Sequence, residues 1–177
     1  MTPELTMTPE LTLVPITVDQ ARELLAGVVP SSWQRVTGFP APGDLRAVSM
    51  LVATAEAPGA PVPAELVRYG PFRLVRTEDG ATVGMAGFHG PPDADGVAEI
   101  GYGIAPGARR RGYAVAAALA LKELAASLGA TTLMARTEPD HIASRRVMER
   151  IGLQLVRVDA TEVEYRAVLP GAGTLST

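Results

Sequence analysis

The sequence predicts a mixed α/β fold built as a single domain. Its 177 residues are enough to bury one hydrophobic core. Hydrophobic residues make up 47% of the chain and charged residues 20%, as in globular rather than disordered proteins. Segments with strand-like and helix-like apolar patterns follow one another along the chain, which is typical of a mixed α/β domain.

The N-terminal third predicts one strand followed by two helices. The apolar strand is expected over residues 11–16, and the first helix over residues 17–29, before Pro30. Residues 38–43 are rich in Pro and Gly and indicate a turn. A second helix is expected over residues 45–55.

The middle of the chain predicts three strands. Two of them, over residues 72–76 and 82–89, are joined by a turn at Glu78-Asp79-Gly80. A Gly/Pro-rich loop over residues 90–96 leads to the third strand, over residues 97–105.

The C-terminal part predicts two further helices, each followed by strands. Gly129 is placed to cap the first helix, Asp140 to begin the second and Gly152 to end it. The expected elements are a helix over 114–128, a strand over 131–136, a helix over 140–151, and strands over 153–158 and 162–168.

Composition excludes several kinds of site. The chain has no cysteine and only two histidines, His89 and His141, so disulfides, thiolate chemistry and a histidine-rich zinc site are excluded, and no metal is expected. The formal net charge of −3, without blocks of like charge, gives no electrostatic reason to expect nucleic-acid binding. No signal peptide or apolar stretch of about 18 to 20 residues is present, which predicts a cytoplasmic protein that does not bind membranes.

The first twelve residues are the hexapeptide MTPELT written twice, too short to form a repeat fold. We therefore expect residues 1–10 to be disordered, residues 11–170 to form the domain, and residues 171–177 to be a flexible tail.

The segment with the clearest chemical signal lies between a predicted strand and a predicted helix. It reads Arg109-Arg110-Arg111-Gly112-Tyr113-Ala114. Gly112 permits a tight turn, and the start of the following helix offers unpaired N–H groups and a positive dipole end. These features, with three arginines, suit a diphosphate, although a solvated basic turn is the alternative. Neither the P-loop nor the GxGxxG pattern is present.

This segment resembles the (Q/R)-x-x-G-x-(G/A) pyrophosphate loop of the GNAT acetyltransferases. The resemblance covers about residues 72–158 and is strongest for the branch containing the ribosomal-protein N-terminal acetyltransferases. Four landmarks occur in the order of the family: Glu99-Ile100-Gly101-Tyr102 with Ala105-Pro106, the loop itself, Ala143-Ser144, and Arg150-Ile151-Gly152-Leu153.

The resemblance implies a central, mixed and mostly antiparallel sheet of about six or seven strands, flanked by about four helices and splayed at the cofactor site. It implies acetyl-CoA as co-substrate and a small-molecule or peptide amine as acceptor, and it leaves a homodimer open. The cofactor-binding residues that it implies are Arg109, Arg110, Arg111, Gly112, Tyr113 and Ala114 through their amides, Ile104 and Ala105 through free backbone groups facing the pantetheine arm, and His141 in place of the family's asparagine.

Two residues are predicted to be catalytic. Strand alternation puts Glu99 on one face with Gly101 and Gly103, which indicates empty space beside a carboxylate that could serve as general base. Ser144 lies on the apolar face of the last predicted helix, where related enzymes are thought to use a serine at the leaving thiol. The tyrosine that many family members use as acid is replaced here by Met148.

The predicted function is therefore direct acetyl transfer from acetyl-CoA to a primary amine in a ternary complex. Two alternatives stay open at this point. One is a non-catalytic acyl-CoA-binding or regulatory domain on the same fold, and the other is a nucleotide-binding domain with a different diphosphate ligand.

Overall fold

The computed structural model describes residues 5–6 and 10–171. They form two compact units, the first from Met1–Gly87 and Tyr102–Ala117 and the second from Phe88–Gly101 and Ala118–Thr177. The predictions for both terminal segments stay predictions, because residues 1–4, 7–9 and 172–177 lie outside the described part. Leu5–Thr6, which are described, form a short strand.

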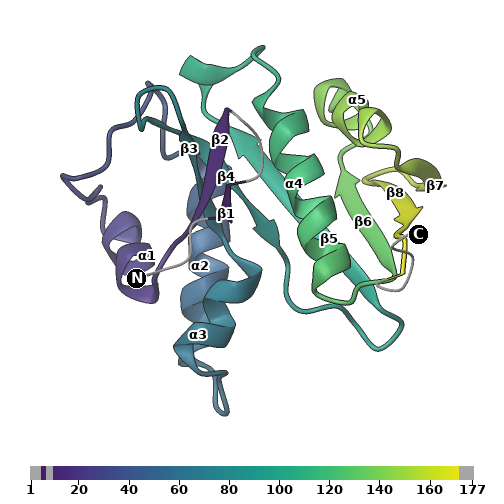
Figure 1. Cartoon of the computed structure of the whole chain (residues 1–177), viewed down its shortest axis with the longest axis horizontal. Coiled ribbons are helices and arrows are strands. Elements are labelled where there is room, and N and C mark those ends of the chain that lie inside the picture. The colour runs from purple at the N-terminus through teal and green to yellow at the C-terminus, as the bar shows by residue number, and fades with distance from the viewer. Residues whose placement is uncertain (1–4, 7–9, 172–177) are drawn as a thin grey trace, which may run out of the picture. The chain divides into compact units, whose positions relative to one another are not determined.

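The first unit is organised around an antiparallel sheet (Figure 1). Each of its strands pairs with the next along the chain, from β1 to β4. In β2 the burial alternates, because every second side chain faces the core. These strands are β1 (Leu5–Thr6), β2 (Leu11–Pro15), β3 (Phe72–Arg76) and β4 (Thr82–Phe88).

Three α-helices lie wholly within the first unit: α1 (Val18–Leu25), α2 (Pro42–Glu56) and the short α3 (Pro63–Leu66). A capping box formed by Thr17 and Gln20 begins α1. The helices share one apolar cluster with Met85 of β4, so they cover that face of the strand. The cluster consists of Ile16, Ala21, Leu24, Trp33, Phe39, Val48, Leu51, Leu66, Met85 and Ala105.

Strand β5 (Val97–Ile104) contributes residues to both units. In the second unit it pairs in parallel with β6 (Thr132–Thr137), which pairs in turn with β8 (Val163–Val168). Strand β7 (Gln154–Val158) forms the edge next to β8. Helix α5 (Ile142–Arg150) packs beside β6.

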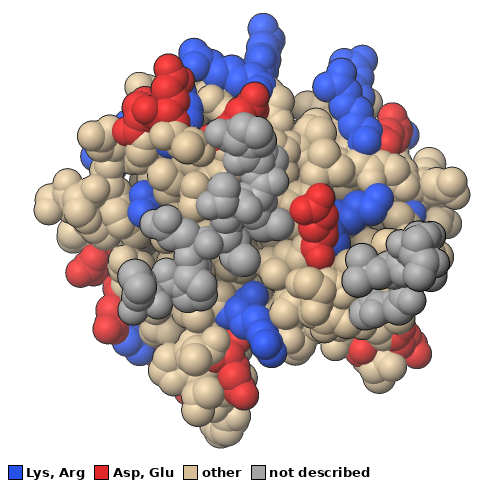
Figure 2. All heavy atoms as spheres, viewed as in Figure 1, with Lys and Arg blue, Asp and Glu red and all other residues tan. Residues whose placement is uncertain are grey.

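Between β5 and the long helix α4 (Tyr113–Ser127) lies one turn of 3-10 helix, Pro106–Ala108. Gly129 ends α4 with a φ of 85°, as predicted. Basic and acidic side chains are interspersed on the face shown in Figure 2. Within the described ranges, no helix is long and apolar enough to cross a membrane.

The predicted fold class is confirmed: strands β2 to β8 form a mixed, mostly antiparallel sheet with helices around it. The differences are local. A proline at the first helical position allows α3 to form in a segment predicted as loop. The first helix ends at Leu25 rather than at residue 29, because Gly27 adopts a φ of 80°. Helix α5 is capped by His141 and not by Asp140.

Candidate functional site

The connection from β5 to α4 is held by the segment before α2. Gly107 N–H donates to the carbonyl oxygen of Thr37 at 3.0 Å. A Cβ atom at Gly107 would lie 2.9 Å from that oxygen, and one at Gly38 would lie 2.7 Å from the ring of Pro106. Because backbone meets backbone this closely, the start of the loop has little freedom to move.

The loop itself contains two residues in the left-handed region, Arg110 with φ 62° and Gly112 with φ 80°. Such residues turn successive amides toward one side of the chain, which creates a concave site for anions. Ala116 N–H donates to the Gly112 carbonyl at 3.0 Å, so the helix begins here. The amides of Tyr113 and Ala114 in its first turn therefore lack intrahelical acceptors and carry the positive end of the helix dipole.

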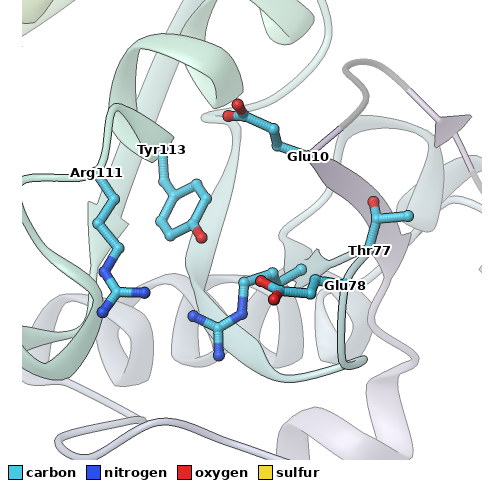
Figure 3. Close-up of a pocket in the computed structure, with 6 residues that line it drawn as sticks. Glu10, Thr77, Glu78, Arg111 and Tyr113 are labelled. Carbon is cyan, nitrogen blue, oxygen red and sulfur yellow. The ribbon is translucent and has the colours of Figure 1, made fainter.

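Beside this loop lies a pocket of about 360 Å³ (Figure 3). Tyr113 enters it from the first residue of α4 and Arg111 from the loop before it, whereas Glu10 precedes β2 and Glu78 lies in the β3–β4 turn. Arg76 lines the pocket as well, so two carboxylates and two arginines face it together. The loop amides are consequently a better place for a diphosphate than this mixed-charge pocket.

We expected Ile104 and Ala105 to present free backbone groups, but the Ala105 N–H and the Ile104 carbonyl both have partners. Ala105 N–H donates to the carbonyl of Val83 at 2.8 Å. The Ile104 carbonyl accepts from Nε of Arg109 at 3.1 Å. A ligand that pairs with the end of β5 must therefore displace the Arg109 side chain, or use other groups.

Glu99 is held by two basic side chains of the second unit. Its Oε1 lies 3.2 Å from Nδ1 of His89, and its Oε2 lies 3.5 Å from Nη2 of Arg136. The hydrogen bond with His89, with a smaller contribution from Arg136, holds the pKa of the Glu99 carboxyl below its ordinary value, although partial burial opposes this. Glu99 is therefore an anion at neutral pH.

The predicted empty space beside Glu99 is partly filled by the protein itself. A Cβ atom at Gly101 would lie 3.0 Å from Nε2 of His89, so the imidazole occupies the room that this glycine leaves. In the sequence His89 ends the predicted strand over residues 82–89, next to the loop over 90–96. Its backbone N–H donates to the Glu99 carbonyl at 2.9 Å, which places the two residues opposite each other.

A second carboxylate, Asp44, lies near Gly103 of β5 in the first unit. Asp44 is only 3% exposed, and its Oδ1 would lie 3.8 Å from a Cβ atom at Gly103. Its Oδ2 accepts from Ala41 N–H at 2.7 Å and so caps α2. Burial raises the pKa of Asp44 to about 6, although the hydrogen bond from Ala41 opposes the shift.

The raised pKa predicts how Asp44 affects stability. The folded state holds the Asp44 proton up to about pH 6, whereas the unfolded chain releases it near the ordinary pKa of 3.8. The free energy of unfolding should therefore fall by about 2 kcal/mol between pH 4 and pH 7 through this group. Asp44→Asn keeps an oxygen acceptor for Ala41 and should lack this fall in urea unfolding measured at both pH values. An equal pH dependence in the two proteins would contradict the prediction.

The start of α5 brings Ser144 and His141 together. The Ser144 N–H donates to Nδ1 of His141 at 3.1 Å, so the imidazole caps the helix and its Nε2 is the nitrogen that carries hydrogen in the neutral form. Met148, one turn further on, is 1% exposed and belongs to the core. The family's usual acid position thus carries no proton donor here.

Comparison with known proteins agrees with this architecture. A family model described as the acetyltransferase (GNAT) domain matches residues 10–154. The uncharacterized N-acetyltransferase YjdG of Bacillus subtilis (strain 168) is 36% identical over 83 residues, which are 46% of this chain and 49% of the relative. The match thus spans about half the length of this curated relative.

Two solved structures extend the likeness to nearly the whole chain. The acetyltransferase from Agrobacterium tumefaciens str. C58 is 29% identical with a TM-score of 0.61, over 94% of this chain and 95% of that chain. RimL, a ribosomal L7/L12 alpha-N-protein acetyltransferase in complex with coenzyme A, is 14% identical with a TM-score of 0.60, over 94% and 98% of the two chains, and shows a common fold. With the family model matching most of its length, the chain belongs to the GNAT acetyltransferase family.

Proposed function

We propose that this protein moves acetyl from acetyl-CoA to a primary amine, by direct attack in a ternary complex. The observation that carries the proposal is the turn before α4, with left-handed Arg110 and Gly112 and the first helical amides behind them. Such a turn matches the charge and size of a diphosphate. That RimL was solved in complex with coenzyme A is additional support.

In this proposal the amides from Arg109 to Ala114 hold the diphosphate, and the arginine side chains add charge-assisted hydrogen bonds. When the ligand binds, the guanidinium of Arg109 leaves the Ile104 carbonyl and contacts the diphosphate instead. The Nε2–H of His141 donates one hydrogen bond to the pantetheine arm.

Glu99 assists removal of the proton from the acceptor. A lysine-like amine with a pKa of about 10.4 costs about 4.6 kcal/mol to deprotonate at pH 7, and an α-amine near 8 costs about 1 kcal/mol. An anionic carboxylate beside the amine lowers this cost when it directs a proton path. Direct attack is favoured because the chain has no cysteine to form an acyl-enzyme.

Ser144 is proposed to donate a proton toward the leaving thiolate. Ser144→Ala should then lower kcat about 100-fold without changing the affinity for acetyl-CoA, because the hydroxyl acts only as the C–S bond breaks. Stopped-flow thiol release and calorimetry measure the two quantities. An unchanged kcat would mean that the thiolate departs without help from Ser144.

The acceptor is a peptide N-terminus or a small-molecule amine. Thiol release from acetyl-CoA, followed across a panel of peptides, polyamines and aminoglycosides, tests the proposal. We expect at least one amine to accelerate release well above the rate of hydrolysis. Binding of ATP or NAD in preference to acetyl-CoA would contradict the proposal.

A further inference from the structure

We propose that His89 is the group that accepts the acceptor's proton, and that Glu99 positions its imidazole rather than acting as the base itself. This inference rests on the acetyl transfer proposed above. Within the second unit, the imidazole of His89 contacts the carboxylate of Glu99 on one side and approaches Gly101 on the other.

The contact with Glu99 fixes the imidazole tautomer. Nδ1 of His89 lies 3.2 Å from Oε1 of Glu99, a distance at which the carboxylate favours the neutral tautomer with its hydrogen on Nδ1. The lone pair is then on Nε2. A carboxylate that orients a histidine in this way also stabilises the imidazolium formed when Nε2 takes a proton.

The position of Nε2 supports the same role. It lies over Gly101, at 3.0 Å from the place that a Cβ atom would take, on the strand face that Glu99 shares. Among the residues that the structure describes, Nε2 has no hydrogen-bond partner, and the side chain is 48% exposed. The nitrogen is thus accessible to an incoming amine.

Glu99 is the poorer base of the two. Its contacts with His89 and Arg136 stabilise the anion, and a carboxylate stabilised in this way binds a proton weakly. Histidine is the side chain that exchanges protons near neutral pH, as a general base at working pH must. His89 therefore accepts the proton, and Glu99 orients its imidazole.

The acceptor nitrogen loses two protons during acetyl transfer. Nε2 of His89 takes one proton from the acceptor ammonium, which leaves a neutral amine with a lone pair. That lone pair forms the new C–N bond at the thioester carbon, the C–S bond breaks, and its electron pair leaves with the sulfur. The second proton lost by nitrogen reaches the thiolate or solvent, and the imidazolium returns the first proton to solvent.

Two variants of His89 test the assignment in the full-length protein. His89→Ala should lower kcat at least about 100-fold with an unchanged Kd for acetyl-CoA, and added imidazole should restore part of the rate. His89→Gln keeps a donor toward Glu99 and preserves the local fold, yet it should be as slow as His89→Ala because an amide cannot take the proton.

Gly101→Ala provides an independent test through a double-mutant cycle. The added Cβ atom should displace the imidazole and lower kcat as strongly as His89→Ala, and it should have no further effect in the His89→Ala background. Additive losses would overturn the inference, since Gly101 would then act without His89.

Failure of this inference differs from failure of the proposed function. If the wild type releases thiol with an amine and both His89 variants keep kcat within about threefold, Glu99 acts without His89 and only this inference is overturned. If the wild type neither binds acetyl-CoA nor releases thiol, the proposed function fails, and the proposed role of His89 fails with it.

Discussion

Replacing Glu99 by glutamine should lower kcat by a factor of about 100 to 10,000 while leaving the affinity for acetyl-CoA unchanged. Glutamine keeps the size of the side chain and an oxygen that accepts from Nδ1 of His89. It removes the negative charge that stabilises a protonated imidazole, and that charge matters only when the proton moves. Stopped-flow thiol release gives kcat, and calorimetry gives Kd for acetyl-CoA.

Glu162→Gln is a matched control for this variant. Glu162 also faces Arg136, at 3.6 Å, so the same change of charge is made beside the same guanidinium. We expect kcat to stay within about threefold of the wild type, because Glu162 makes no contact with His89. Equal losses in the two variants would show that Glu99 acts only through the general electrostatics of Arg136. If the protein only bound acyl-CoA and did not catalyse transfer, the wild type would show no turnover, and Glu99→Gln could not lower kcat.

Gly84→Ala should destabilise the protein by about 4 kcal/mol or more, which is exceptional for the addition of one methyl group. A Cβ atom at Gly84 would overlap the carbonyl oxygen of Gly103 and lie 3.0 Å from Cα of Ile104. Both neighbours are backbone atoms of β5 and cannot rotate away. The strand would have to separate from β4, and the hydrogen bond from Ala105 to Val83 lies at the same place.

Urea unfolding of Gly84→Ala and of a control, Gly43→Ala, measures this effect. Gly43 lies in the first turn of α2 with no atom within 4 Å of an added Cβ atom, so alanine there should stabilise the protein by up to about 1 kcal/mol. A loss of less than about 1 kcal/mol for Gly84→Ala would mean that β4 and β5 are farther apart than described.

Local features of the sequence were sufficient to predict the loop. Gly112 signals the turn because glycine tolerates a positive φ, and the helix behind it follows from a run of Ala and Leu. The same holds for the strands and for Gly129, since each of these signals lies within a few neighbouring residues. The positive φ of Arg110 has no such signal in the sequence.

Two features could not be predicted from local signals: the contacts of Glu99 and the burial of Asp44. His89 reaches Glu99 only because the two residues face each other across the loop over 90–96, so their contact depends on how the strands on either side of the loop pair. Asp44 carries a visible helix-start pattern after Pro42, but its burial depends on the close approach of Gly103, which lies 59 positions further on. That approach exists only in the folded protein.

The most direct test of the central claim is a calorimetric titration with acetyl-CoA of the wild type, Gly112→Ala and Gly129→Ala. Both glycines have a positive φ, 80° and 85°, and open space around an added Cβ atom, so both substitutions carry a similar backbone strain of about 1 to 3 kcal/mol. Of these two glycines, only Gly112 lies in the loop that orients the amides before α4. We predict that the wild type and Gly129→Ala bind acetyl-CoA equally well and that Gly112→Ala binds at least about tenfold more weakly. Equal affinity of all three proteins would contradict diphosphate binding at this turn.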